Sequence, residues 1–207
     1  MYIEINNVSK KLKKNIVLQN INIKLEQGKI YGIVGKNGCG KTMLLRAIAG
    51  LLKPDTGEVI VNGINIYKNK PNHTTGVIIE NVDLFSNLSA FNNLKLLNGF
   101  NKNPVSDKKI IEVLEQIGLD PYSKKVYKNF SLGMKQKLCI AQALIPEPDI
   151  LILDEPTNAL DAESVKCFNK IVLEKDPNTT VIIASHLADE INSVCEKIIN
   201  MENGKII

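Results

Sequence analysis

The stretch "GKNGCGKT", residues 35–42, is the feature that most constrains this chain, because of what lies on either side of it. The apolar run "KIYGIV" (29–34) precedes it, and "TMLLRAIAGLL" (42–52) overlaps its end. The first pattern predicts a strand buried on both faces and the second a helix. A glycine-rich turn between two such elements directs successive backbone N–H groups, and the positive end of the helix, toward one point. We therefore predict an anion site formed by Gly35, Lys36, Asn37, Gly38, Cys39, Gly40, Lys41, Thr42 and Met43.

The spacing Gly-x4-Gly-Lys-Thr fits the P-loop that holds nucleoside triphosphates. In such a loop Lys41 reaches the β- and γ-phosphates, and the hydroxyl of Thr42 ligates Mg²⁺. An ordinary tight turn between strand and helix is the alternative interpretation, and the position between a buried strand and a helix argues against it. Cys39 occupies a place that requires a small residue, and the simplest interpretation is that it replaces alanine.

A second motif, "ILILDEPT" (150–157), ends an apolar run with two acids. Asp154 is expected at the carboxyl edge of the sheet, where ligands of open α/β folds bind, and it can hold Mg²⁺ through water. Glu155 would face the γ-phosphate and orient or deprotonate an attacking water. The alternative is an exposed acidic pair that caps the next helix. Taken with the P-loop, the motif indicates a nucleoside triphosphatase.

The pattern along the chain predicts a single α/β domain over residues 1–207, with a mostly parallel sheet and an antiparallel β lobe. Residues 1–82 and 131–207 are assigned to the core and this lobe, and the asparagine-rich block 83–130 to a helical insertion. The turn Asn62-Gly63 is expected to join two short strands. Further strands are predicted at 2–8, 16–25, 75–80, 149–156 and 179–186, helices at 106–119, 131–144 and 187–198, and a hairpin at 198–207.

Composition narrows the class of protein further. No window approaches eighteen apolar residues, and the N-terminus lacks the layout of a signal peptide, so we expect a cytoplasmic protein. The net charge of +4 is spread along the chain, and its densest cluster, "KKLKK" (10–14), is interpreted as a solvated turn; no nucleic acid is expected as a partner. Four isolated cysteines and two histidines predict no zinc site and no disulfide framework.

A resemblance to a known family follows from "FSLGMKQKL" (130–138), which lies a short helix upstream of "ILILDEPTNALD". The first segment resembles the signature motif of ABC-type ATPases, the nucleotide-binding subunits of ABC transporters. The resemblance covers the whole chain, because the helical insertion, signature, acidic motif, "NALD" and His186 follow the P-loop in the family's order. The segment "NVDLFSNLSAFNNLKLL" (81–97) is similar to the branch that exports bacitracin and lantibiotics or confers immunity to them.

The resemblance implies the ABC ATPase fold and roles for particular residues. Two subunits would enclose two ATP molecules head to tail, with Ser131 and Gly133 of one subunit facing the γ-phosphate bound by the other. Asp161 would lie at the seam between subunits, or cap a helix, or do both. His186 would contact the γ-phosphate or brace the water, unless it is only a hydrogen-bonded structural residue. The metal ligands would be Thr42, Glu80 and Asp154.

Several residues depart from the family pattern or limit its mechanism. Leu132 and Met134 replace the usual glycine and glutamine of the signature. Leu12 stands where an aromatic residue usually stacks on adenine, so we expect weak base selectivity, with GTP hydrolysed within about tenfold of ATP. Arg46 is the one arginine in the chain, so a helix dipole from the second subunit is a more plausible source of charge at the γ-phosphate than an arginine finger.

The resemblance implies an ATP-hydrolysing subunit, peripheral on the inner face of the cell membrane, that powers a separate permease. Its paired nucleotide-binding subunit would be an identical copy or a different chain. A soluble ABC ATPase acting on ribosomes or DNA, and a nucleotide-sensing module without turnover, are the alternatives. The permease would contact the region 80–92, through apolar residues that could equally serve packing within the lobe: Leu84, Phe85, Leu88 and Phe91.

Overall fold

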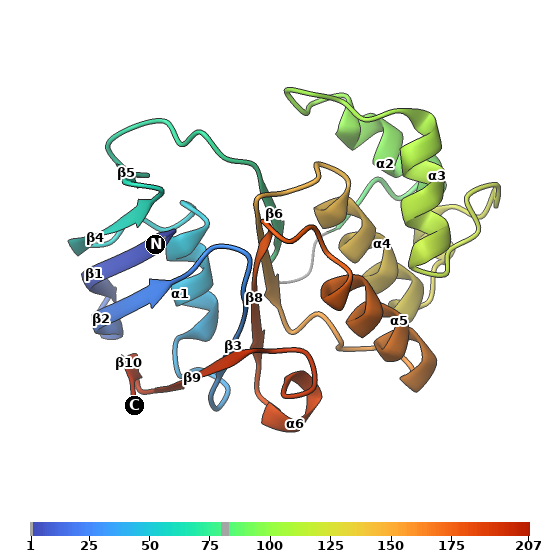
Figure 1. Ribbon diagram of the computed structural model, residues 1–207. Coiled ribbons are helices and arrows are strands. Elements are labelled where there is room, and N and C mark those ends of the chain that lie inside the picture. The colour runs from blue at the N-terminus through green and yellow to red at the C-terminus, as the bar shows by residue number, and fades with distance from the viewer. Residues whose placement is uncertain (1, 80–82) are drawn as a thin grey trace.

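The computed structural model describes residues 2–79 and 83–207, which form two β-sheets flanked by helices (Figure 1). The first sheet is antiparallel and has the order β2-β1-β4-β5. Its longest strands form a hairpin that pairs Ile3 with Leu25 and Leu12 with Asn15. The strands are β1 (Ile3–Leu12), β2 (Asn15–Leu25), β4 (Thr56–Val61) and β5 (Ile64–Asn65).

The second sheet has the order β10-β9-β3-β8-β7-β6 and confirms the mostly parallel sheet predicted from the sequence. Its pairings are parallel except at β10, which pairs antiparallel with β9. The strands are β3 (Ile30–Val34), β6 (Thr75–Ile78), β7 (Ile150–Asp154), β8 (Thr180–Ser185), β9 (Lys197–Glu202) and β10 (Lys205–Ile206).

Helices cover this parallel sheet on both faces. Helix α1 (Lys41–Ile48) lies on the side of the antiparallel sheet, and α4 (Leu132–Leu144) and α5 (Ala162–Leu173) lie on the other side (Figure 1). Farther out are α2 (Ala90–Asn98) and α3 (Asp107–Gln116), and a one-turn helix α6 (Ala188–Ile191) follows β8. None of the helices formed by the described residues combines the length and apolar character needed to cross a bilayer.

The apolar strands of the parallel sheet contribute alternate residues to two hydrophobic cores. In β7, Leu151 and Leu153 join the core beneath α4 and α5, whereas Ile150 and Ile152 join the core around α1 and the antiparallel sheet. Every residue of β7 and β8 is buried. Burial on both faces explains why these strands are continuous apolar runs rather than alternating ones.

Strand pairing and hydrogen bonding explain three of the boundaries that differ from the prediction. The helix predicted at 187–198 is limited to Ala188–Ile191, because Lys197 already pairs with Tyr31 of β3 in the sheet. The first strand extends to Leu12, so the turn of the lysine-rich segment is confined to 13–14. Helix α1 ends at Ile48, where the N–H groups of the next turn bond to the carbonyl of Arg46.

The region 83–130 is organised by buried and capping polar side chains. Asn93 is completely buried, accepts a hydrogen bond from the Phe85 amide at 2.8 Å and donates to the carbonyls of Phe85, Leu88 and Ser89. Ser106 caps helix α3, because its hydroxyl accepts a hydrogen bond from the Lys109 amide. Leu84 and Phe91 pack partly buried against the helical core, and Phe85 is 47% exposed. The predicted permease contact at these residues stays a prediction.

Tyr67 ties the end of α1 to the loop beyond it, and its replacement by phenylalanine is expected to destabilise the fold by about 1 kcal/mol. The hydroxyl lies 2.7 Å from the carbonyl oxygens of both Ala47 and Leu52, which would lose this donor. Urea unfolding of the two proteins measures the difference. Tyr122→Phe is the matched control, because that ring is 74% exposed and its change should leave stability unaltered.

The pH dependence of the stability of wild type and Tyr67→Phe provides a second test. Burial raises the pKa of Tyr67 from its ordinary value of 10 to about 12. Between these values the phenol ionises in the unfolded chain before it does so in the folded one, which favours unfolding as the pH rises. The stability advantage of wild type over Tyr67→Phe should therefore be constant below pH 10 and shrink through pH 12. A difference that stays constant across this range would contradict the assigned burial of the hydroxyl.

Candidate functional site

Three strands of the parallel sheet end together, and the loops that follow them carry the predicted site residues. Val34 of β3 pairs with Ser185 of β8, and Asp154 of β7 pairs with Ala184 of the same strand. The P-loop, Glu155 and His186 therefore leave the sheet from one edge. Helix α1 begins at this edge as well, which directs its N-terminal backbone amides toward the same space.

The glycines of the P-loop are required at this edge for two different reasons. A Cβ atom at Gly35 would lie 2.2 Å from the carbonyl oxygen of Met201, and one at Gly40 would lie 2.6 Å from that of Val17. Gly38 has open space around it but a φ of 80°, which residues with a side chain rarely adopt. The loop thus packs tightly against the protein on one side and stays open on the other.

Lys41 is a buried cation held between a carbonyl and a carboxylate. Only 5% of the residue is exposed. Its Nζ donates a hydrogen bond to the Gly35 carbonyl at 2.6 Å and lies 3.8 Å from Oε1 of Glu155. A buried ammonium group needs such partners, and the oxygens of a bound phosphate can supply them equally well.

Thr42 and Asp154 meet at the start of α1. The Thr42 hydroxyl donates to Oδ2 of Asp154 at 2.5 Å, and Asp154 is only 9% exposed. A hydroxyl and a carboxylate oxygen are the hard donors that Mg²⁺ prefers, and this ion is commonly completed by substrate phosphates and water. Among the described residues, no group of three or more His, Cys, Asp or Glu side chains could hold a metal. The donor types of Thr42 and Asp154 fit Mg²⁺ that is completed by phosphate oxygens and water.

Glu155 lies between the buried lysine and His186. Its Oε2 is 2.9 Å from Nδ1 of His186, and its buried Oε1 has no hydrogen-bond partner among the described residues. Its φ of 48° is unusual for a residue with a side chain, and its amide bonds to the Ala184 carbonyl at 2.9 Å. One carboxylate oxygen is thus anchored while the other is available to accept a proton.

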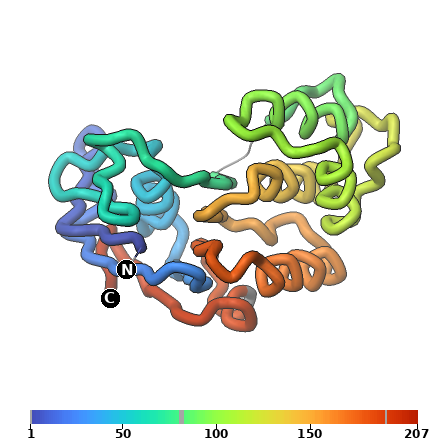
Figure 2. Tube along the Cα trace, turned by 45° about the horizontal axis from the view of Figure 1, so that its top comes forward, coloured from blue at the N-terminus to red at the C-terminus, as the bar shows by residue number. Residues whose placement is uncertain are grey.

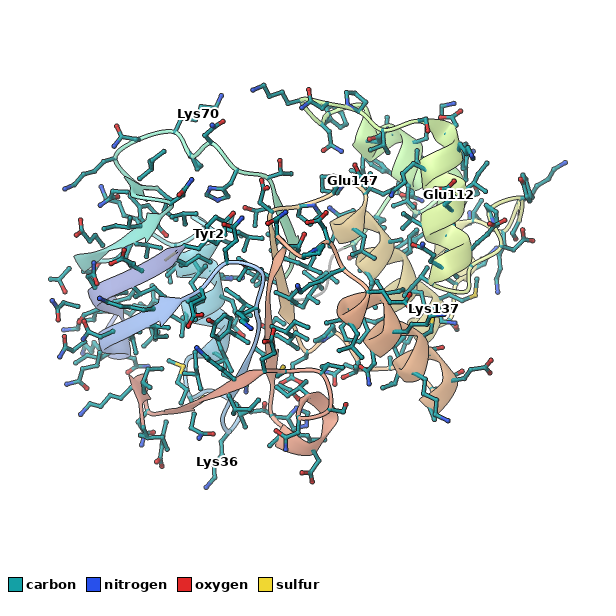
Figure 3. All side chains as sticks on the ribbon, in the orientation of Figure 1. Tyr2, Lys36, Lys70, Glu112, Lys137 and Glu147 are labelled. Carbon is teal, nitrogen blue, oxygen red and sulfur yellow. The ribbon has the colours of Figure 1, made fainter. Side chains whose placement is uncertain are left out.

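The cavity at this edge has a volume of about 290 Å³. Val17 of β2 contributes to its wall and was not predicted from the sequence. Leu12 does not line it, nor do Lys36 and Cys39, and Figure 3 shows the Lys36 side chain directed away from the protein body. The nucleotide contact and the weak base selectivity predicted from Leu12 stay predictions. The lining residues are Val17, Asn37, Gly38, Gly40, Lys41, Thr42, Met43, Asp154 and Glu155.

Ser131, Gly133 and Asp161 lie at the starts of α4 and α5 and, like Gly35 and His186, do not line this cavity. The Ser131 hydroxyl accepts from the Met134 amide at 3.2 Å and caps α4. Asp161 caps α5, which confirms that predicted role, and hydrogen bonds from the Ser164 hydroxyl and amide hold the pKa of Asp161 below its ordinary value. Glu80 lies outside the described residues, two positions after the last residue of β6.

The start of α4 is packed against the loop that follows Glu155. A Cβ atom at Gly133 would lie 2.9 Å from the carbonyl oxygen of Ala159, and Gln136 donates to the Pro156 carbonyl at 2.8 Å. The signature segment and the "NALD" segment are therefore neighbours, although they are separated by a helix and a strand in the sequence. Leu132 beside them is 74% exposed.

Comparisons with known proteins agree with this geometry. A family model described as ABC transporter matches residues 18–158. The chain is 44% identical to the uncharacterised ABC transporter ATP-binding protein YybJ of Bacillus subtilis, covering 99% of the chain and 94% of the relative. It is 39% identical to the bacitracin transport ATP-binding protein BcrA of Bacillus licheniformis, over 92% of the chain and 63% of that protein.

Solved structures give the same result. A dimeric bacterial ABC transporter cassette is similar with a TM-score of 0.86 and 26% identity, covering 99% of this chain and 96% of the other. The same cassette in a dimeric post-hydrolysis state, bound to ADP and phosphate, gives a TM-score of 0.85 at 25% identity, with the same coverage of both chains. The chain belongs to the ABC transporter family and is an ATP-binding, ATP-hydrolysing subunit of that family.

Proposed function

We propose that two copies of this chain close head to tail around two ATP molecules, and that this closure drives a separate membrane permease. The position of Glu155 carries the proposal. It lies at the phosphate cavity between Lys41 and His186, and its Oε2 contacts His186 while its Oε1 has no hydrogen-bond partner among the described residues and lies 3.8 Å from Nζ of Lys41. A nucleotide sensor without turnover does not need a base in this position.

The proposed hydrolysis uses these residues in defined roles. Lys41 and the P-loop amides bind the β- and γ-phosphates, and Glu155 takes a proton from the water whose oxygen forms the new bond to the γ-phosphorus. The bond from the γ-phosphorus to the bridging oxygen breaks, which leaves ADP and phosphate. His186 orients Glu155 through the contact at Nδ1. Thr42, Asp154 and Glu80 would hold Mg²⁺, which neutralises charge on the phosphates.

The second copy would supply the signature residues that are missing from the cavity of a single chain. Ser131, Gly133 and Asp161 do not line the cavity of their own chain, and the N-terminus of α4 can present backbone amides to an anion. Arg46 is the one arginine of the sequence and lies in the last turn of α1. The dimeric structures of the similar cassette support this arrangement.

We further propose export of, or immunity to, bacitracin- or lantibiotic-like peptides. Besides BcrA, the chain is 36% identical to the lantibiotic transport ATP-binding protein SrtF of Streptococcus pyogenes, over 99% of the chain and 89% of that protein. Residues 83–130 would form the helical lobe that contacts the permease at the cytoplasmic face of the membrane. A structural relative, cbiO1 of Clostridium perfringens, is described as part of a transporter complex.

Light scattering tests the two-copy arrangement. We expect Glu155→Gln to double its mass when ATP and Mg²⁺ are added, because the nucleotide remains uncleaved between the subunits. Adding Ser131→Arg should prevent the doubling while ATP still binds, since a long cation at the start of α4 obstructs the second subunit. A Glu155→Gln protein that binds ATP and keeps the mass of one chain would contradict the arrangement.

A further inference from the structure

The hairpin turn at Asn203-Gly204, which joins β9 to β10, contacts the backbone of the P-loop. The Gly204 amide donates a hydrogen bond to the Cys39 carbonyl at 2.8 Å, and the Gly204 carbonyl accepts one from the Gln19 amide at 2.8 Å. Gly204 is buried, although it belongs to a hairpin turn. The turn therefore joins the P-loop to β2, and Figures 1 and 2 show β10 close to β2.

These contacts fix the orientation of one peptide group in the P-loop. In a trans peptide the C=O of one residue and the N–H of the next point in opposite directions. The bond from Gly204 to the Cys39 carbonyl thus turns the Gly40 N–H away from the hairpin. Gly40 lines the phosphate cavity, so its N–H is one of the amides available to a phosphate.

The packing around this peptide leaves little freedom. A Cβ atom at Gly40 would lie 2.6 Å from the Val17 carbonyl oxygen and 2.8 Å from Cε of Met201. A Cβ atom at Gly204 would lie 2.9 Å from the same Val17 oxygen. Met201 itself is only 2% exposed. Val17 lines the cavity, as Gly40 does. A shift of the hairpin would therefore move both of these residues of the cavity wall.

We infer that Gly204 is a positioning residue for ATP binding, acting through the Cys39–Gly40 peptide of the P-loop. The inference rests on the proposed role of the P-loop amides in holding the phosphates. It assigns a function in nucleotide affinity to a turn that is more than 160 residues away from the P-loop in the sequence. It also predicts that nucleotide binding stabilises the C-terminal hairpin in return.

The chain provides a matched control in its other Asn-Gly turn. Asn62 and Gly63 have φ angles of 49° and 78°, and Asn203 and Gly204 have 46° and 77°. Replacing either glycine by alanine therefore imposes a similar backbone strain. The surroundings differ, since nothing lies within 4 Å of a Cβ atom at Gly63. Only Gly204→Ala would disturb the P-loop.

The test compares ADP affinity and ATPase kinetics of wild type, Gly204→Ala and Gly63→Ala. We expect Gly204→Ala to weaken ADP binding and raise KM by about fivefold or more, with kcat within about twofold, because weaker phosphate binding in both the ground state and the transition state changes KM alone. Gly63→Ala should keep both values within about twofold of wild type. Equal affinity in the three proteins would overturn the inference, and a wild type that binds no ADP would instead contradict the proposed site.

Hydrogen exchange of the wild type keeps the inference testable if Gly204→Ala does not fold. With ADP and Mg²⁺ added, amide protection should increase in the peptide containing Gly204 and stay unchanged in the peptide containing Gly63. An unchanged exchange rate at Gly204, with ADP bound, would show that the hairpin and the nucleotide site are not coupled.

Discussion

Replacing Glu155 by glutamine should lower the turnover of ATP by about 10²- to 10⁴-fold, the usual contribution of a general base. Glutamine has nearly the same size, so the packing beside Ala184 and His186 is retained. The amide cannot accept the proton of the attacking water. Affinity for ATP should be equal to or higher than that of wild type, because Lys41 remains in place and a negative charge near the γ-phosphate is removed.

Phosphate release and direct ATP binding, measured on the same preparation, separate these two effects. Glu174→Gln is the matched control, because that carboxylate is exposed at the end of α5. Its Oε1 lies 3.9 Å from Nζ of Lys170. It should retain wild-type turnover. A Glu155→Gln protein with turnover within about tenfold of wild type would show that another group takes the proton.

Replacing Lys41 by alanine should weaken ATP binding by about 10- to 100-fold, the equivalent of one or two charge-assisted hydrogen bonds. The buried ammonium group has a carbonyl and a carboxylate as partners, and in the ATP complex it would exchange these for phosphate oxygens. Its removal also leaves Glu155 without a nearby cation, which places a negative charge next to the phosphates. Turnover should fall together with affinity.

Titration of a fluorescent ATP analogue measures this affinity. Lys70→Ala is the matched control, because it removes the same charge from an exposed position in the loop between β5 and β6, far from the P-loop in the sequence (Figure 3). This variant should bind the analogue as wild type does. Circular dichroism of both variants confirms folding. If Lys41→Ala bound the analogue as tightly as Lys70→Ala, the phosphate contact assigned to Lys41 would be wrong.

Local signals in the sequence were sufficient for the elements that carry the chemistry. The P-loop was predictable because its glycine spacing is a local motif, and because Gly38, with its φ of 80°, meets a conformational limit that is local to the turn. Asp161 was predictable as a helix cap for the same reason, since a cap depends on the next three residues. Buried parallel strands were recognisable from their length and apolar character.

Contacts between distant segments were not predictable. The helix expected at 187–198 is shortened because Lys197 pairs with Tyr31, which lies far away in the sequence. Val17 reaches the cavity because its part of β2 packs beside Gly40 and Gly204, and no spacing rule connects these segments. The 2.9 Å contact between Glu155 and His186 likewise depends on the register of β7 against β8. Strand pairing or packing between segments that are distant in the sequence determined these features.

The most direct test of the proposed function is purification of tagged Glu155→Gln from its native cells with ATP present, followed by mass spectrometry. Wild-type protein without ATP is the control, because it should not be held in the closed state. We predict that a membrane protein with several spans copurifies in an ATP-dependent manner. Ribosomes or DNA in place of such a protein would contradict the transporter function and leave only the ATPase.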